Sequence, residues 1–405
     1  MFEWLQKGGR ECLEPAKVYI YIADHEHDRT YVENVVQYLE HEGILSRSIT
    51  LRADGQRPEL QLCIDDRATT VLGFNSTLDH SWLASNSFLS VAEQNRIPIV
   101  QWILDHPSRR WHEFYNSTAT NSRFLLNTEE ERQYFQRYCL PGASTGTMGG
   151  VGPNRRSRIG RLTLGAFMQR RFACMIPIAL QRDPSVGEND KVLSVVEEPL
   201  ADVARQAITN AQFDLTGQLH LHVTAALASR NKTLPAPTFN RICHVVEQSV
   251  QTIRRRKIFK AARKFPVLVQ SDDSAKPHFD AAEAVLETNV TMQFSLARMP
   301  TCRSILSVSP MNGMIHDRTL NALNGGCVAI LEDSAAARRI FTHGKNALLF
   351  RYEDDSIEQC LDIVCNMPER SYAIARAGMA LRDQPRLRFG QFHNILDLAR
   401  RDIFA

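Results

Sequence analysis

The chain has 405 residues, of which 43% are hydrophobic and 23% are charged. This balance is typical of a globular protein and excludes a disordered one, and the length suits two domains better than one. The formal net charge of +3 gives no global argument for a nucleic-acid partner, so none is expected.

The sequence shows no recognisable signal-peptide pattern and no cysteine pattern typical of a metal site. The first ten residues carry charges where a signal peptide needs an apolar segment, and no apolar run approaches the roughly 20 residues that span a bilayer. The nine cysteines are scattered and contain no C-x-x-C pair, which indicates reduced, buried thiols. We therefore expect a cytoplasmic protein without a transmembrane segment or a metal site, while peripheral contact with a membrane stays open.

The first 140 residues alternate between β-rich and helical segments. Strands are predicted where apolar, often β-branched runs are bounded by polar residues, at 17–23, 44–51, 69–74, 97–104 and 122–126. Helices are predicted at 28–42, at 82–95, and after a capping box formed by Thr128 and Glu131. Such alternation predicts a mostly parallel sheet covered by helices on both faces.

The composition changes at 141–158, where five glycines and two prolines occur together with small polar residues. We interpret this segment as a linker between domains or a loop beside one, because Gly and Pro interrupt regular structure. The predicted organisation is one domain at 1–165, a second at 166–385, and a C-terminal helix within 386–405.

The second half begins with a predicted strand at 172–180 and a largely helical stretch at 189–264, after which the alternation returns. Further strands are predicted at 265–270, 290–296, 304–308, 327–331 and 347–350. Helices are predicted at 317–324, 334–341, 369–382, 386–404, and 356–366, the last with Ser356 and Gln359 as its capping pair. The predicted fold class is α/β, with two Rossmann-like domains facing a central cleft, and ligands are expected at the carboxyl ends of the strands.

Between residues 304 and 350, a strand is followed by a small polar loop, a His-Asp-Arg step and a helix that ends in two glycines. This stretch resembles the donor-binding part of glycosyltransferases with a GT-B fold, most of all the group allied to the CgeB-type enzymes; the run 97–107 with 122–127 resembles that group more weakly. The residues that match are Asn312, Gly313, His316, Asp317, Arg318, Ala322, Leu323, Gly325, Gly326 and 341–344.

The resemblance implies a metal-independent transferase of the hexosyltransferase type. It would move a sugar from a nucleotide-sugar donor, UDP- or GDP-linked, to an unidentified acceptor hydroxyl, without a cofactor. The second domain would bind the donor, the first would take the acceptor, and the C-terminal helix would pack back on the first. The residues expected to hold the donor are Ser309, Asn312, Gly313, His316, Asp317, Arg318 and Asn321.

The chemistry of the predicted helix start at Asp317 agrees with a diphosphate ligand. Free N–H groups at a helix N-terminus attract an anion, and the guanidinium of Arg318 could pair with a phosphate in a bidentate way. A purely structural interpretation has Asp317 as the N-cap and Arg318 solvated.

Gly313 and Asn321 stand where many members that retain the anomeric configuration have glutamates. Asn321 could still hydrogen-bond a hydroxyl, but it is neutral. Two alternatives therefore stay open: a binding or scaffold protein that kept the fold and lost catalysis, and another enzyme that uses nucleotide-sugars, such as an epimerase.

Asp105 and His106 follow the predicted strand at 97–104 and are the candidate catalytic residues on the acceptor side. Either could act as a general base for the acceptor hydroxyl, while the alternative is a strand-end turn before Pro107. The acidic and histidine-rich segment 24–28 has a composition found in metal sites, but we interpret it as a polar loop, because nothing fixes its geometry.

Overall fold

A computed structural model describes residues 17–23, 26–51, 70–74, 97–114, 122–149, 158–179, 200–279, 283–309, 315–382, 384, 387 and 392–400. The predicted helix at 82–95 and residues 24 and 25 lie outside these ranges. Within them, no helix combines the length and the hydropathy needed to cross a membrane.

The first unit contains a parallel sheet with the strand order β2-β1-β3-β4-β5-β6. The residues of the two central strands β3 and β4 are all buried, as expected for a parallel sheet with covered faces. The strands are β1 (Lys17–Ala23), β2 (Leu45–Leu51), β3 (Thr70–Phe74), β4 (Ile99–Trp102), β5 (Ser122–Leu126) and β6 (Ser144–Thr147), with helices α1 (Glu26–His41), α5 (Trp111–Phe114) and α6 (Glu129–Tyr134).

The second unit contains another parallel sheet, with the order β12-β11-β10-β7-β8-β9. The chain order reverses between β7 and β10, and this topological switch point is where doubly wound sheets bind ligands. The strands are β7 (Phe172–Pro177), β8 (Leu268–Ser271), β9 (Val285–Thr288), β10 (Cys302–Ser307), β11 (Val328–Glu332) and β12 (Leu348–Phe350). The helices are α7 (Leu164–Met168), α12 (Lys276–Phe279), α13 (Met292–Arg298), α14 (Asp317–Asn324), α15 (Ala335–Arg338), α16 (Ser356–Asn366) and α17 (Pro368–Met379).

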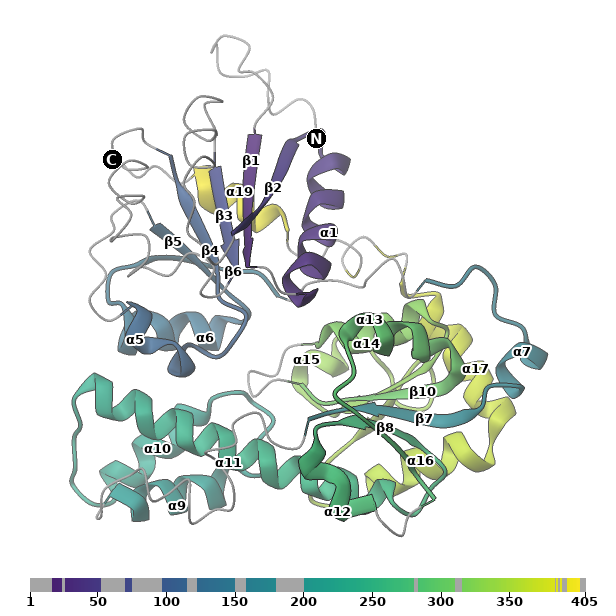
Figure 1. The fold of residues 1–405 in the computed structure, drawn as a ribbon. Coiled ribbons are helices and arrows are strands. Elements are labelled where there is room, and N and C mark those ends of the chain that lie inside the picture. Colours follow the sequence, from purple (N-terminus) through teal and green to yellow (C-terminus); the bar gives the residue numbers. More distant parts are fainter. Residues whose placement is uncertain are drawn as a thin grey trace.

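A helical unit of α9 (Leu200–Ala211), α10 (Leu219–Ala228) and α11 (Ala236–Ala262) lies beside both sheets (Figure 1). Its apolar side chains share one core with Phe124 and Phe135 of the first unit, although the sequence places this stretch within 166–385. The far end of α11 contributes Ile258 and Phe259 to the core of the second unit. The 27-residue helix α11 therefore connects the two units physically, and the boundary at residue 165 stays a prediction.

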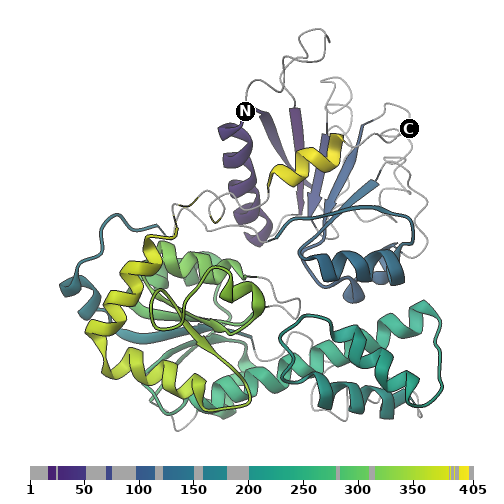
Figure 2. The ribbon, with the colours of Figure 1, turned by 180° about the vertical axis from the view of Figure 1, so that it is seen from behind.

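The C-terminal helix α19 (His393–Arg400) crosses a face of the first sheet (Figure 2). The guanidinium of buried Arg123 donates from Nε to the Leu398 carbonyl at 2.7 Å, and Phe392 lies against Trp102 with ring centroids 6.0 Å apart. The last described residues of the chain thus complete the core of the first unit.

Three sequence predictions are wrong in detail, for local reasons. The segment 290–296 is not a strand, because Thr291 caps α13 by accepting the Phe294 N–H, and the strand is β9. Within 141–158, Ser144–Thr147 is the sixth strand rather than a linker; a Cβ at Gly146 would lie 3.3 Å from a Leu125 methyl, so close packing explains the glycine there.

The third wrong prediction concerns the start of α16. Ser356 does not cap the helix, since Asp355 occupies the N-cap position without a side-chain bond. The Ser356 hydroxyl accepts the Arg351 N–H at 2.7 Å instead and ties the helix to the end of β12.

Candidate functional site

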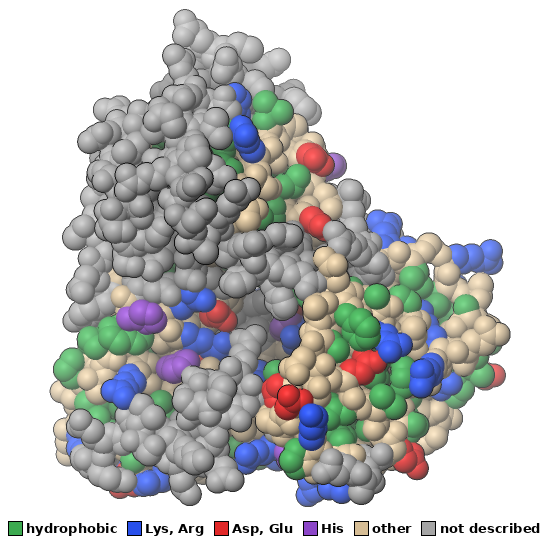
Figure 3. Space-filling view, viewed as in Figure 1, with side chains coloured by type: hydrophobic (Ala, Val, Ile, Leu, Met, Phe, Trp, Pro, Cys, Tyr) green, Lys and Arg blue, Asp and Glu red, His purple; other side chains and the backbone are tan. Residues whose placement is uncertain are grey.

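A cavity of about 340 Å³ lies at the carboxyl ends of β7, β8 and β9 and beside the N-terminus of α14, next to the switch point of the second sheet. Tyr31 of α1 contributes to its lining, so the cavity opens between the two units. The space-filling view is hollowed between these units, and charged side chains are visible at the edge of the hollow (Figure 3). The lining residues are Tyr31, Pro177, Ala179, Gln270, Ser271, Asp272, Asn289, Val290, Met292, Ser295, Leu296, Met299, His316, Asp317, Arg318 and Asn321.

The N-terminus of α14 forms one wall of this cavity. His316 is the N-cap, with extended backbone angles, and its Nδ1 accepts the Arg318 N–H at 3.2 Å. The structural alternative that made Asp317 the N-cap is therefore wrong: Asp317 is the first helical residue, and its carboxylate pairs with the His316 ring. A histidine ring nitrogen can replace the usual Ser, Thr or Asp oxygen as acceptor in this position.

Asp317 is a buried anion at the helix start. Burial opposes its charge, but the His316 imidazole, the Arg318 guanidinium and the Arg318 main-chain N–H together lower its pKa from 3.8 to about 2. Because of this low pKa, the carboxylate of Asp317 is ionised at neutral pH although the residue is only 5% exposed. This carboxylate lies against Nδ1 of His316 and helps to fix the ring that caps the helix.

Arg318 and Asn321 lie on the cavity side of α14, three residues apart and thus on one face of the helix. Asn321 is only 1% exposed, so its carboxamide is desolvated at the cavity wall. Together with the helix N-terminus, these two side chains present a cation and neutral hydrogen-bonding groups to the same space.

Ser309 lies at the other end of the predicted donor segment, and its main-chain N–H donates to Oε2 of Glu332 at 2.8 Å. Glu332 is the last residue of β11 and is 2% exposed; its Oε1 accepts the Tyr352 hydroxyl at 2.6 Å. Burial, with this carboxylate beside it, raises the pKa of Tyr352 well above its ordinary value. Ser309 does not line the cavity, and Asn312 and Gly313 lie outside the described residues.

The opposite wall comes from segments that the sequence did not assign to the donor. Gln270 and Ser271 end β8, and Asn289 has a left-handed backbone with a φ of 56° directly after β9. The Gln270 side-chain amide donates to Glu287 at 2.9 Å, and Glu287 in turn accepts from Arg298 at 2.6 Å. The expectation that ligands bind at the carboxyl ends of strands indicated the end of β8. It did not indicate the end of β9, because a strand was wrongly predicted at 290–296.

Asp105 and His106 lie elsewhere, between the first sheet and α11. His106 is the N-cap of the short helix Pro107–Arg109, and its Nδ1 lies 2.8 Å from Ser108 Oγ. Burial lowers its pKa from 6.5 to about 4 and keeps the ring neutral near pH 7. Asp105 accepts from Arg109 at 3.2 Å, and neither candidate catalytic residue lines the cavity.

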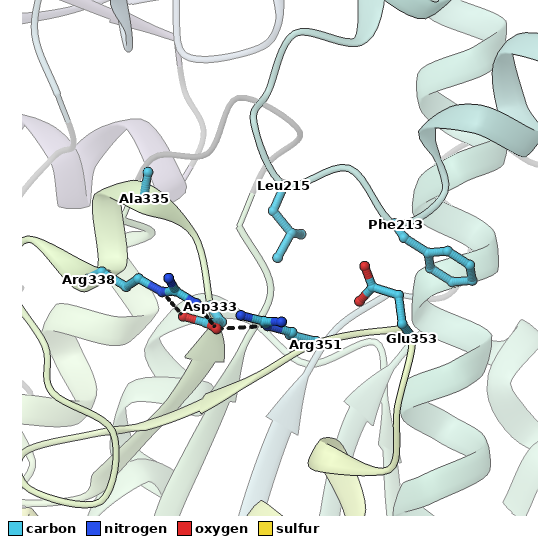
Figure 4. Close-up of a pocket in the computed structure, with 7 residues that line it drawn as sticks. All are labelled: Phe213, Leu215, Asp333, Ala335, Arg338, Arg351 and Glu353. Atoms are coloured by element: carbon cyan, nitrogen blue, oxygen red, sulfur yellow. Dashed lines mark hydrogen bonds and ion pairs between the residues drawn. The ribbon is translucent and has the colours of Figure 1, made fainter.

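A second cavity, of about 320 Å³, lies beside the carboxyl ends of β11 and β12 (Figure 4). The carboxylate of Asp333 forms ion pairs with both arginines that line this cavity. Arg338 donates two hydrogen bonds to it, at 2.5 and 2.6 Å, and Arg351 donates one at 2.9 Å. With Glu353, the charges of the lining residues balance, and Phe213 and Leu215 of the helical unit form its apolar side. These ion pairs join the residue after β11 to α15 and to the residue after β12, and they do not point to a particular ligand.

No protein-family model matches the sequence, and a search of curated proteins finds no match. Solved structures do match over nearly the whole chain. HepE of Anabaena, in complex with UDP and glucose, has a TM-score of 0.50 at 9% identity, over 94% of this chain and 98% of its own.

Two further solved structures show the same likeness. A glycosyltransferase of Rickettsia africae has a TM-score of 0.51 at 8% identity, over 96% of this chain and 100% of its own. The sucrose-phosphate synthase of Thermosynechococcus elongatus has a TM-score of 0.51 at 7% identity, over 94% and 98%. The protein therefore has the two-domain α/β architecture of GT-B glycosyltransferases, with two parallel six-stranded sheets.

Proposed function

We propose that the protein is a glycosyltransferase that moves a sugar from a nucleotide-sugar donor to an acceptor hydroxyl. The observation that supports this most is the N-terminus of α14, which lines the switch-point cavity with Arg318 in its first turn. The bond to the sugar breaks as negative charge develops on the leaving diphosphate. A helix N-terminus and a guanidinium are the groups that stabilise such charge.

The proposed donor is a UDP-sugar, and the proposed transfer is of a hexosyl group without a metal ion. HepE is similar in fold and binds UDP and UDP-glucose. In this chain, His316, Arg318 and Asn321 would contact the donor, with Asp317 fixing the His316 ring. The closer relation to CgeB-type enzymes and the catalytic roles of Asp105 and His106 stay predictions.

The decisive experiment is calorimetry with UDP-, GDP- and ADP-sugars, followed by mass spectrometry of products formed with a panel of acceptors. Arg318→Ala should weaken binding of the preferred donor at least tenfold, whereas Arg338→Ala, in the second cavity, should leave it unchanged. Unchanged binding in Arg318→Ala would remove this helix start from the site.

A second candidate is a binding protein that kept the fold and lost catalysis. It is favoured by Asn321, because a neutral amide lies at the cavity wall where related enzymes that retain the anomeric configuration often use a carboxylate. Tight binding of UDP and UDP-glucose, with neither transfer nor hydrolysis across the acceptor panel, would select this candidate.

A further inference from the structure

The main chain that leaves β10 toward α14 is fixed by a carboxylate from the neighbouring strand. Ser309, two residues past the end of β10, donates its N–H to Glu332 at 2.8 Å. The cavity wall begins at His316, on the same connection between β10 and α14. Ser309 therefore lies seven residues before His316, the N-cap of α14.

Glu332 is itself held by a second partner. Its other oxygen accepts the hydroxyl of Tyr352, which is 2% exposed and follows β12. The guanidinium of Arg254 in α11 lies over the Tyr352 ring, 5.1 Å from its centroid. Arg254 Nε donates to the Gln212 carbonyl at 2.9 Å, at the end of α9. One continuous series of contacts thus runs from Arg254 in the helical unit through Tyr352 and Glu332 to Ser309.

Packing alone does not explain a carboxylate in this position. Burying an anion is costly unless its oxygens receive hydrogen bonds, and an apolar residue of similar size would fill the space at lower cost. Here each oxygen receives one donor, and a charge-assisted bond to a main-chain N–H is both short and directional. Such a bond fixes the course of the chain.

We propose that Glu332 is a positioning residue for the donor site, held in turn by Tyr352. By fixing Ser309, it holds the main chain where the chain leaves β10, seven residues before the N-cap of α14, and so helps to keep the helix N-terminus and Arg318 at the cavity. This inference rests on the proposed function, since its consequence is tighter binding of the donor diphosphate.

Three variants and one control test the role of Glu332. Glu332→Ala removes both bonds and Tyr352→Phe removes one, whereas Glu332→Gln keeps an acceptor for Ser309 and can donate to the Tyr352 oxygen. Asp333→Asn is the matched control, because it changes the next residue along the chain, which binds arginines rather than Ser309. Each protein is titrated with UDP by calorimetry, and hydrogen exchange is followed in peptides that contain the Ser309 amide.

Glu332→Ala should speed exchange of the Ser309 amide and weaken UDP binding, each at least tenfold. Tyr352→Phe should show smaller effects of the same sign, and Glu332→Gln and Asp333→Asn should stay within threefold of the wild type. If Glu332→Ala does not fold, Tyr352→Phe alone decides: exchange and UDP affinity both unchanged overturn the proposal. A lowered unfolding temperature with unchanged UDP affinity overturns it too, because it indicates a purely structural role.

UDP binding by the wild-type protein distinguishes a failure of the proposed function from a failure of the role proposed for Glu332. If the wild-type protein binds neither UDP nor any UDP-sugar, the proposed function fails. If the wild type binds UDP and a folded Glu332→Ala binds it equally well, the function stands and the role of Glu332 is wrong.

Discussion

Arg109 and Glu247 form a two-point ion pair that joins the segment after β4 to α11, with Nε–Oε2 and Nη2–Oε1 distances of 3.0 and 2.8 Å. The Glu247 side chain is 1% exposed and that of Arg109 is 12% exposed. Although burial opposes the charge of Glu247, Arg109 holds its pKa below the usual range. Since α11 also enters the core of the second unit, this pair connects the first sheet to the helix that reaches both units.

Removing one partner of this pair should strongly destabilise the protein. Arg109→Ala leaves a buried carboxylate with its principal cation gone, and such changes cost about 3–5 kcal/mol. The free energy of unfolding, measured by urea denaturation, reports the loss. The double variant Arg109→Met/Glu247→Leu should recover most of it, because no charge is then left buried; a double variant as unstable as the single one would contradict this account.

His106 should make the protein less stable in mild acid. Its pKa is about 4 in the folded protein and near 6.5 when unfolded, so between these values the unfolded chain binds the extra proton. Stability is therefore full above pH 6.5 and falls toward pH 4, by at most about 3 kcal/mol at 1.36 kcal/mol per pKa unit. Asn at this N-cap keeps an acceptor for the Ser108 N–H.

The measurement is the free energy of unfolding of His106→Asn and wild type at several values between pH 4 and pH 7. The variant should show a flatter dependence, and an identical slope would contradict the assignment. The same variant tests the catalytic prediction: loss of sugar transfer with unchanged UDP binding would support His106 as the general base.

The substitution Gly378→Ala in α17 has two opposite effects on stability, a gain in helix propensity and a loss from close contacts. Alanine favours a helix by up to about 1 kcal/mol over glycine, but a Cβ at this position would lie 2.9 Å from the Asn346 carbonyl oxygen and 3.0 Å from a Leu323 methyl. Because one contact is main chain, we expect a net loss of about 1–3 kcal/mol in thermal unfolding. Gly165→Ala in α7, which meets no atom within 4 Å, is the control and should be neutral or stabilising.

Asn321→Ala should weaken UDP-sugar binding without abolishing it. One neutral hydrogen bond contributes about 1 kcal/mol, or roughly fivefold in the dissociation constant, less than the loss expected for Arg318→Ala. Calorimetry decides, with Asn366→Ala on the surface of α16 as the control. An affinity unchanged by Asn321→Ala would mean that this amide does not contact the donor.

Much of the secondary structure could be predicted because its signals are local. The bounds 317–324 of α14 and 17–23 of β1 agree with the structure residue for residue, and Thr128 caps α6 as predicted. The helix start bearing Arg318 could be expected at a strand's carboxyl end from the same local signals. In contrast, the alternation at 290–296 suggested a strand, yet Phe294 is 42% exposed while Leu296 is buried, as helical spacing and the Thr291 cap require.

Local signals in the chain were enough to predict the two α/β halves and the polar helix start at 316–318, because caps and hydrophobic periodicity act over a few residues. Tertiary structure alone decided that Ser309 meets Glu332, 23 residues further along, and that α11 enters the cores of both units. Those contacts depend on which strands become neighbours and how helices pack on them. No short-range pattern encodes that choice, since the burial of apolar surface that drives it has no fixed spacing along the chain.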